Sequence, residues 1–289
     1  MCKFFTTFVP DFDVIMEKIS KAQVKLIRSL QQKKFRDELG LFVAEGDKCV
    51  SELAKAFELV YLIVEDGLIV PTVLQRSGLT GEAGHLTASA IEISQISGLR
   101  TPQGVIGVFK KPITNYPSQI TNSGLVLALD GIQDPGNLGT IIRTCDWFGV
   151  HDIVCSLDTA DCYNPKVVQA TMGALARVRI HYVDLPAWLQ SQIKIYGTLL
   201  DGKDMYEVLQ SAGRPDSEAV LQHSGLTGKA GHAVIVMGNE GNGISPEVRK
   251  FITHPIRIPS YPKHAETSES LNVSIATAIV LAEFRRLGL

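Results

Sequence analysis

The sequence has 289 residues and a formal net charge of −2, and 45% of its residues are hydrophobic while 20% are charged. This composition is that of a folded globular protein, which excludes a disordered or fibrous chain, and the length allows two ordinary domains. No apolar run reaches the roughly 18 residues of a membrane span, and neither the five cysteines nor the histidines have metal-ligand spacing, so we expect no membrane contact, no metal and a reducing cytoplasm.

The chain begins with an extension and a basic segment. Residues 1–17 are expected to be a loose extension, with Met16 as an alternative start. Residues 18–36 carry seven lysines and arginines and no acid, and a helix is expected there. A solvated helix face is one interpretation, but the absence of interspersed acids favours a contact with a polyanion. The candidate contacts are Lys25, Arg28, Lys33, Lys34 and Arg36.

A small α/β unit is predicted over residues 18–111. Its strands are the apolar runs "LFVAEG", "LVYLIVED" and "VIGVFKK", with a helix at about 48–57. The following residues, 112–123, are rich in Pro, Asn, Ser and Thr and are predicted to be a linker.

From residue 124 to 289, continuous apolar runs alternate with helical patterns, which predicts a parallel sheet covered on both faces. The predicted helices lie at 138–149, 164–175, 186–192, 246–252 and 270–286. The predicted strands are "LVLALDGI", "DIVCSL", "RVRIHYV", "IKIYGTLL", "AVIVMGN" and "PIRIPS".

One segment occurs twice. "LQRSGLTGEAGH" (74–85) and "LQHSGLTGKAGH" (221–232) agree at 10 of 12 positions. A phosphate-binding P-loop is disfavoured, because no Ser or Thr follows Lys229. We interpret the two copies as inserted surface loops, where added length costs little.

Three polar clusters follow predicted strands. In "LDGIQDPGNLGTIIRTCDWFGV" (129–150), a turn precedes a helix, for which Asn137 is a candidate N-cap. Arg143, further along that helix, is either functional or an ion-pair partner of Asp146.

The second cluster is "VMGNEGNGIS" (236–245), with its glycines in the order G-x-x-G-x-G after a late strand. A dinucleotide fold requires G-x-G-x-x-G after an early strand, so NAD is disfavoured. Glu240 would repel a phosphate, and it suits a ribose hydroxyl or a sulfonium.

The third cluster, residues 258–286, places Ser270 and Asn272 at the start of an apolar helix that is buried or lies in an interface. Together, "DPGNLGTIIRT", "VMGNEGNGIS" and "SLNVSIATAI" resemble the SpoU (TrmH-like) branch of the SPOUT RNA methyltransferases over 124–289. Residues 18–111 resemble that family's accessory substrate-binding domain of the L30e type, mainly through "LFVAEGDKCVSEL".

The resemblance implies an α/β fold with a C-terminal trefoil knot, bound S-adenosylmethionine, and methyl transfer to a ribose 2′-hydroxyl of RNA. It also implies a homodimer joined through the last helix, and RNA phosphates held by the basic segment. The implied cofactor contacts are Met237, Gly238, Ile258 and Leu271. The implied catalytic residues are Asn137, Arg143, Glu240, Ser270 and Asn272.

Ribosomal RNA is the preferred substrate and transfer RNA the second. An RNA-binding protein that has lost catalysis and a Rossmann-type oxidoreductase are the remaining alternatives. The family's third motif usually contains I-P-M-x-G, whereas this sequence has "IPSYPKHAETSE". This difference leaves open the conformation of residues 259–269 and any role of His264, Glu266 or Glu269.

Overall fold

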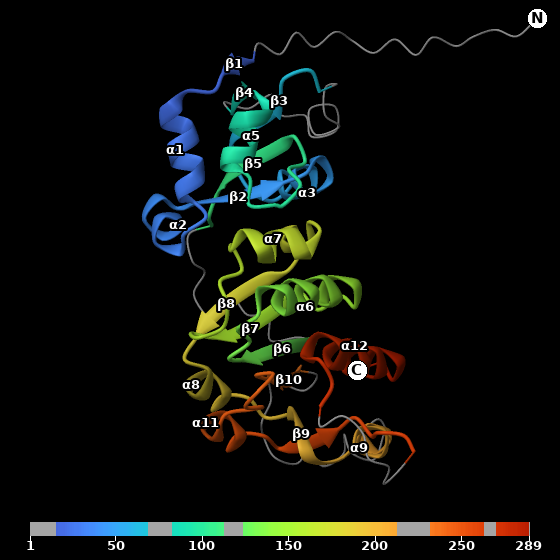
Figure 1. The fold of residues 1–289 in the computed structure, drawn as a ribbon. Helices are drawn as coiled ribbons and strands as arrows, with labels where there is room; N and C mark the ends of the chain where they lie inside the picture. Colours follow the sequence, from blue (N-terminus) through green and yellow to red (C-terminus); the bar gives the residue numbers. More distant parts are fainter. Residues whose placement is uncertain (1–15, 69–82, 113–123, 213–231, 263–269, 289) are drawn as a thin grey trace, which may run out of the picture.

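A computed structural model describes residues 16–68, 83–112, 124–212, 232–262 and 270–288. The extension before Met16, the linker and most of the two repeated segments lie outside the described residues, as do His264, Glu266 and Glu269. Figure 1 shows an N-terminal part stacked on a C-terminal part, with α7 (Pro165–Thr171) beside the junction.

The N-terminal part is a five-stranded sheet in the order β1-β4-β3-β5-β2. Strand β5 is antiparallel to its neighbours β2 and β3, while β1, β4 and β3 are parallel. The strands are β1 (Glu17–Lys18), β2 (Leu41–Glu45), β3 (Leu59–Glu65), β4 (Gly84–Ala88) and β5 (Val105–Lys110). The helices are α1 (Lys21–Ser29), α2 (Lys33–Leu39), α3 (Asp47–Leu53) and α5 (Ala90–Ile96).

The single basic helix expected over residues 18–36 is wrong, because the segment forms two helices. Helix α1 begins with a capping box between Ser20 and Gln23, and its C-cap is Leu30. Helix α2 then runs to Gly40, whose φ of 63° ends the helix in the left-handed conformation that glycine tolerates.

The C-terminal part is a six-stranded sheet in the order β11-β9-β10-β6-β7-β8. Every neighbouring pair is parallel, so the predicted parallel sheet is confirmed. The strands are β6 (Gly124–Asp130), β7 (Asp152–Ser156), β8 (Arg179–Val183), β9 (Ile195–Asp204), β10 (His232–Gly238) and β11 (His254–Arg257). The helical segments are α6 (Pro135–Trp147), α7, η2 (Ala174–Ala176), α8 (Leu185–Leu189), α9 (Met205–Ala212), α11 (Pro246–Arg249) and α12 (Val273–Arg286).

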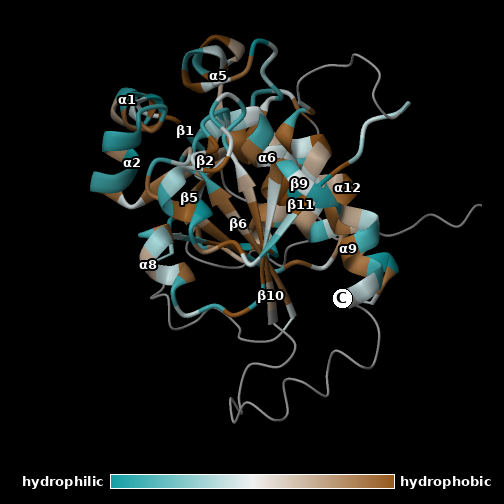
Figure 2. Ribbon diagram, turned by 90° about the horizontal axis from the view of Figure 1, so that it is seen from below, coloured by the Kyte–Doolittle hydropathy of each residue, from teal (hydrophilic) through white to brown (hydrophobic). Residues whose placement is uncertain are grey.

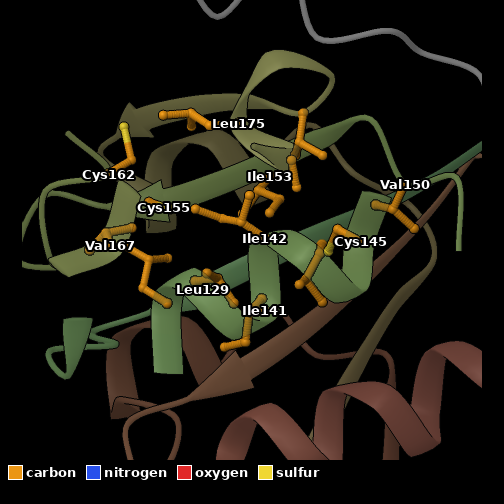
Figure 3. Close-up of a cluster of buried hydrophobic side chains, with 14 of the residues drawn as sticks. Leu129, Ile141, Ile142, Cys145, Val150, Ile153, Cys155, Cys162, Val167 and Leu175 are labelled. Carbon is orange, nitrogen blue, oxygen red and sulfur yellow. The ribbon is translucent and has the colours of Figure 1, made fainter. Parts of the chain in front are cut away.

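Alternate side chains of the central strands enter two separate cores. Leu127 and Leu129 of β6 pack into the core formed with α6, α7 and α12, part of which Figure 3 shows. Val126 and Ala128, the alternate residues of β6, pack with α8 and α11. Figure 2 shows hydrophobic strands such as β6 and β10 in the middle, with polar residues on the surrounding helices. Both faces of the sheet are therefore covered, as predicted.

The described residues contain neither a membrane-spanning helix nor a cluster of metal-ligating side chains. None of the helices in these residues is both long enough and apolar enough to cross a membrane. The same residues contain no group of three or more His, Cys, Asp or Glu side chains arranged to hold a metal ion.

Candidate active site

The carboxyl ends of β6 and β10 lie side by side, with Asp130 of β6 opposite Gly238 of β10. The loop after β10 folds back on itself, because the backbone groups of Asn239 and Gly243 exchange two hydrogen bonds of 2.9 Å. A Cβ atom on Gly238 would lie 2.3 Å from the carbonyl carbon of Gly243. Glycine is therefore required at residue 238 for this close approach of the backbone.

Asn239 connects this loop to the turn after β6. Its side-chain nitrogen donates to the Gly131 carbonyl at 2.7 Å, and its Oδ1 accepts from the amides of Gly241 and Asn242. The buried carboxylate of Asp130 accepts from the Ser245 amide at 2.7 Å. Side chains at the strand ends thus fix both turns relative to each other.

Three of the predicted catalytic side chains form one hydrogen-bonded chain. The side-chain nitrogen of Asn137 donates to Glu240 Oε1 at 2.8 Å, and that of Asn272 donates to Asn137 Oδ1 at 3.0 Å. The three residues come from three different motifs, and Asn137 lies 103 positions from Glu240 and 135 positions from Asn272 along the sequence. The structure therefore brings the three predicted motifs together through their own polar side chains.

The N-cap residues of α6 and α12 explain how the hydrogen-bonded side chains of Asn137 and Asn272 are oriented. Asn137 is not the N-cap of α6, because Asp134 accepts the Asn137 backbone amide at 2.8 Å and Pro135 begins the helix. The amide side chain of Asn137 is consequently free to reach Glu240. Asn272 is the N-cap of α12, and its Oδ1 accepts from Ser274 and Ile275, which directs its nitrogen toward Asn137.

Arg143 is an exposed residue of α6, and its side chain has no hydrogen bond or ion pair with any described residue. It follows Asn137 by six residues, or about 9 Å along the helix axis. The alternative ion pair between Arg143 and Asp146 is wrong, because Asp146 binds the guanidinium of Arg177 at 2.8 Å. The guanidinium of Arg143 is therefore available to a ligand.

Ser270 is exposed at the edge of the described residues, where it forms no hydrogen bond with them. It lies two residues before the N-cap of α12 and therefore beside the chain of polar side chains. Its predicted role in catalysis stays a prediction.

The four predicted cofactor contacts lie on three segments: Met237 and Gly238 end β10, Ile258 follows β11, and Leu271 precedes the N-cap of α12. Met237 is 2% exposed and points into the core, so only its backbone is available, while the Leu271 side chain is 51% exposed. Ile258 is partly buried against the core beyond β11. These residues and Gly238 belong to segments that meet at the carboxyl edge of the sheet.

Sequence reasoning missed the end of β9. Gly197 of β9 pairs with Val236 of β10, and the Thr198 hydroxyl lies 3.7 Å from Met237 Sδ. Leu200, two residues further on, is 70% exposed. A Cβ atom on Gly202 would lie 2.5 Å from the backbone of Ile256. The available signal was "GTLLDG", in which the apolar run of β9 changes to Asp201 and Gly202 before the strand ends at Asp204.

The basic residues divide into exposed and buried ones. Lys25, Arg28, Lys33 and Lys34 are exposed and form no ion pair with the described part of the chain. The prediction that Arg36 contacts RNA is wrong, because its side chain is 2% exposed and bonded to Asp161 at 2.7 Å. Lys21 is exposed as well and lies one helical turn before Lys25 on α1.

Comparison with known proteins identifies the family. The SpoU rRNA methylase family matches residues 124–282, which is more than half of the chain. The chain belongs to the SpoU rRNA methylase family. This confirms the predicted resemblance and makes the protein an RNA methyltransferase. An MRM3-like substrate-binding domain matches residues 21–107, which confirms the expected N-terminal α/β substrate-binding domain.

Individual relatives match between 69% and 95% of this chain. A 23S rRNA (guanosine(2553)-2′-O)-methyltransferase from Bacillus subtilis is 28% identical over 93% of this chain and 98% of its own. A 23S rRNA (guanosine-2′-O-)-methyltransferase from Neisseria meningitidis is 32% identical over 69% of this chain and 75% of its own. The structure of an rRNA methyltransferase with bound AdoMet from Sinorhizobium meliloti is 29% identical, with a TM-score of 0.75 over 95% of this chain and 98% of its own.

Proposed function

We propose that the protein transfers the methyl group of S-adenosylmethionine to a ribose 2′-hydroxyl of ribosomal RNA. The single observation that carries this proposal is the hydrogen-bonded series of Asn137, Glu240 and Asn272. On the same helix as Asn137 lies the guanidinium of Arg143, which has no partner among the described residues. The activities named for the relatives from Bacillus and Neisseria support the rRNA 2′-hydroxyl as the acceptor.

The carboxyl edge of the sheet fits S-adenosylmethionine. The Gly243 backbone fills the place of a side chain on Gly238, so this tight turn presents backbone groups to a ligand. The exposed side chains of Leu200 and Leu271 offer apolar contacts for an adenine ring. When bound, the cofactor supplies a methyl group on a positively charged sulfur, which is a good leaving group. The Glu240 carboxylate beside Gly238 suits that charge or a ribose hydroxyl.

The chain's own residues must orient and activate the acceptor. A ribose hydroxyl is a weak nucleophile at neutral pH, so its alignment and the loss of its proton limit the reaction. Arg143 cannot take that proton as an ordinary base, because a guanidinium offers only hydrogen-bond donors and no acceptor atom. We infer that Arg143 holds an RNA phosphate and stabilises the developing alkoxide. Asn137 and Ser270 orient the ribose, and Asn272 and Glu240 hold Asn137 in place.

The N-terminal helices supply affinity for RNA. Lys25 and Arg28 lie on α1, and Lys33 and Lys34 on α2, all exposed and without acidic partners among the described residues. Their contacts with phosphates provide affinity that depends on salt and not on the base sequence. The chemistry is confined to the C-terminal sheet.

We infer a homodimer joined through α6 and α12. Ile275, Ile279 and Ala282 follow one another at spacings of four and three on α12, and each is exposed or partly exposed. Figure 1 shows α6 beside α12, and Trp147 at the end of α6 is 84% exposed. An apolar surface of this kind is typical of an interface. The trefoil knot stays a prediction, because residues 263–269 between β11 and α12 lie outside the described chain.

The test measures transfer of labelled methyl from S-adenosylmethionine to purified ribosomal RNA and, separately, to transfer RNA. Digestion to nucleosides identifies the product. We expect a 2′-O-methylnucleoside from ribosomal RNA with the wild type, and no such product with Arg143→Ala. Label in transfer RNA alone would contradict the proposed substrate. Failure of the wild type to bind S-adenosylmethionine would favour an RNA-binding protein without catalysis.

A further inference from the structure

A buried ion pair joins the N-terminal helix α2 to the loop after β7. Arg36 Nη2 and Nε donate to Asp161 Oδ2 at 2.7 and 3.1 Å, and the two side chains are only 2% and 10% exposed. Arg36 Nη1 also donates to the carbonyls of Leu30 and Gln31 between α1 and α2. One guanidinium thus closes the α1–α2 turn and attaches it to the methyltransferase domain.

The contact around this pair is tightly packed and largely apolar. The ring of Phe42 lies 4.8 Å from that of Tyr163, and one hydrophobic core contains residues of both domains. Burial raises the pKa of Cys49 to about 11, so its thiol stays protonated, and it donates to the Val168 carbonyl at 3.9 Å. The two domains therefore meet as packed surfaces.

A second set of contacts lies between α3 and the segment after α7. Arg177 binds Glu52 and Asp146 at 2.8 Å each, which connects α3 with α6. A Cβ atom on Gly173 would lie 2.6 Å from the Cβ of Glu52. Because the domains touch at both places, rotation of one against the other would break contacts at one end.

The loop that carries Asp161 is itself bonded to the first motif. The Ala160 amide donates to the Ile132 carbonyl at 2.8 Å, and the Gly131 amide donates to Ser156 Oγ at 2.8 Å. Gly131 in turn accepts from Asn239 of the second motif. In Figure 1, α1 and α2 lie on the side toward which β7 and β8 point, which is the side of these loops. A short series of hydrogen bonds therefore leads from α2 to the turn beside the candidate active site.

We propose that Arg36 and Asp161 are a positioning pair that sets which ribose reaches the active site. The inference rests on the proposed function, because it assumes that the exposed cations of α1 and α2 hold RNA. RNA that is bound by α1 and α2 stays at a fixed distance from the active site if the junction between the domains is rigid. Only one nucleotide of the RNA then reaches the active site. A loosened junction would admit neighbouring riboses and lower the fraction of productive encounters.

The test uses Asp161→Asn in the full-length protein, with Asp37→Asn as the matched control. Asp37 lies on the same helix as Arg36, but its half-exposed carboxylate pairs with Lys111. For Asp161→Asn we expect unchanged binding of S-adenosylmethionine, RNA affinity within about twofold because the phosphate contacts remain, and kcat lowered by about tenfold or more through misplacement of the ribose. Mapping of the product should show 2′-O-methyl groups on neighbouring riboses. Asp37→Asn should behave as the wild type.

Rates are expressed per molecule that binds S-adenosylmethionine, so a loss of folded protein does not imitate the effect. A purely structural role predicts fewer active molecules with an unchanged kcat and an unchanged methylation site, and this result would overturn the proposal. If Asp161→Asn does not fold, Arg36→Lys keeps the charge without the planar fork and should move the same two readouts less far. Absence of methyl transfer by the wild type would instead contradict the proposed function.

Discussion

At the scale of single residues, the position of Asn137 determines how the site is assembled. Asp134 precedes Pro135 and caps α6, which leaves the Asn137 amide to join Glu240 and Asn272. The convergence of the three motifs was predictable, because parallel strands end on one edge of a sheet. The choice between Asp134 and Asn137 as the N-cap, three positions apart, was not predictable, because both Asp and Asn are good N-caps.

Substitutions of Arg143 distinguish a role in charge stabilisation from a role in proton removal. We expect Arg143→Lys to retain measurable methyl transfer, because an ammonium still stabilises a phosphate and an alkoxide, while Arg143→Ala loses about 10²–10³-fold in kcat. Steady-state methylation of rRNA measures both. Complete loss of activity in Arg143→Lys, with cofactor and RNA binding intact, would contradict charge stabilisation as the role of Arg143.

A substitution at Gly238 tests whether the tight backbone turn after β10 binds the cofactor. Gly238→Ala places a methyl group 2.3 Å from the Gly243 backbone, so the loop must move and S-adenosylmethionine affinity should fall by at least about tenfold, as for a lost close approach. Gly241→Ala is the matched control, because its Cβ would meet only the Asn239 side chain at 3.6 Å. Calorimetric titration measures both. Equal affinities in the two variants would count against contact with the cofactor at Gly238.

The burial of Arg36 could not be predicted from the local sequence pattern. It belongs to an unbroken series of cations, yet its partner Asp161 lies 125 positions away and buries it. Burial of a charged residue depends on tertiary contacts, so counting charges along a segment assigns it wrongly to the surface.

At the scale of elements, the sequence predicted most of what positions the site. The buried strands β6, β7 and β10 are continuous apolar runs, which is typical of parallel strands covered on both faces. Strand β4 and helices α5 and α9 were not predicted. Strand β4 overlaps the end of the first repeated segment, whose Gly-rich composition indicated only a loop, and α5 and α9 are short helices of seven and eight residues.

The exposed cations of α1 and α2 predict a salt-dependent affinity for RNA. Replacing Lys25, Arg28, Lys33 and Lys34 by Gln should lower the slope of log K against log salt by about 3, since each phosphate contact contributes roughly 0.7 to 0.9. Cofactor affinity should not change. Lys18→Gln is the control, because Lys18 already pairs with Asp66 and Glu92. An unchanged slope in the fourfold variant would place the RNA elsewhere.

At the scale of the whole molecule, two features bear on assembly. One packed core extends from the substrate-binding domain into the methyltransferase domain, while the outer face of α12 stays apolar. The first makes the two domains act as one body within a protomer. The second provides a surface through which two protomers can join.

Ile275→Glu tests the proposed dimer. The carboxylate is compatible with the first turn of α12, where negative charge is favourable, but it would be buried without a partner at the interface. Ile91→Glu introduces the same change in the first turn of α5, where Ile91 is 72% exposed. In sedimentation equilibrium we expect dimers for the wild type and Ile91→Glu and monomers for Ile275→Glu. A monomeric wild type would contradict the proposed interface.

The central claim is that the Asn137–Glu240–Asn272 site methylates a ribose 2′-hydroxyl. Its most direct test follows labelled methyl transfer to a ribosomal RNA fragment that contains the mapped target, and to the same fragment with a 2′-deoxy sugar at that nucleotide alone. The account predicts transfer to the first RNA and none to the second, with equal binding of both. Transfer to the deoxy fragment at the same nucleotide would show that the acceptor is the base and would contradict the account.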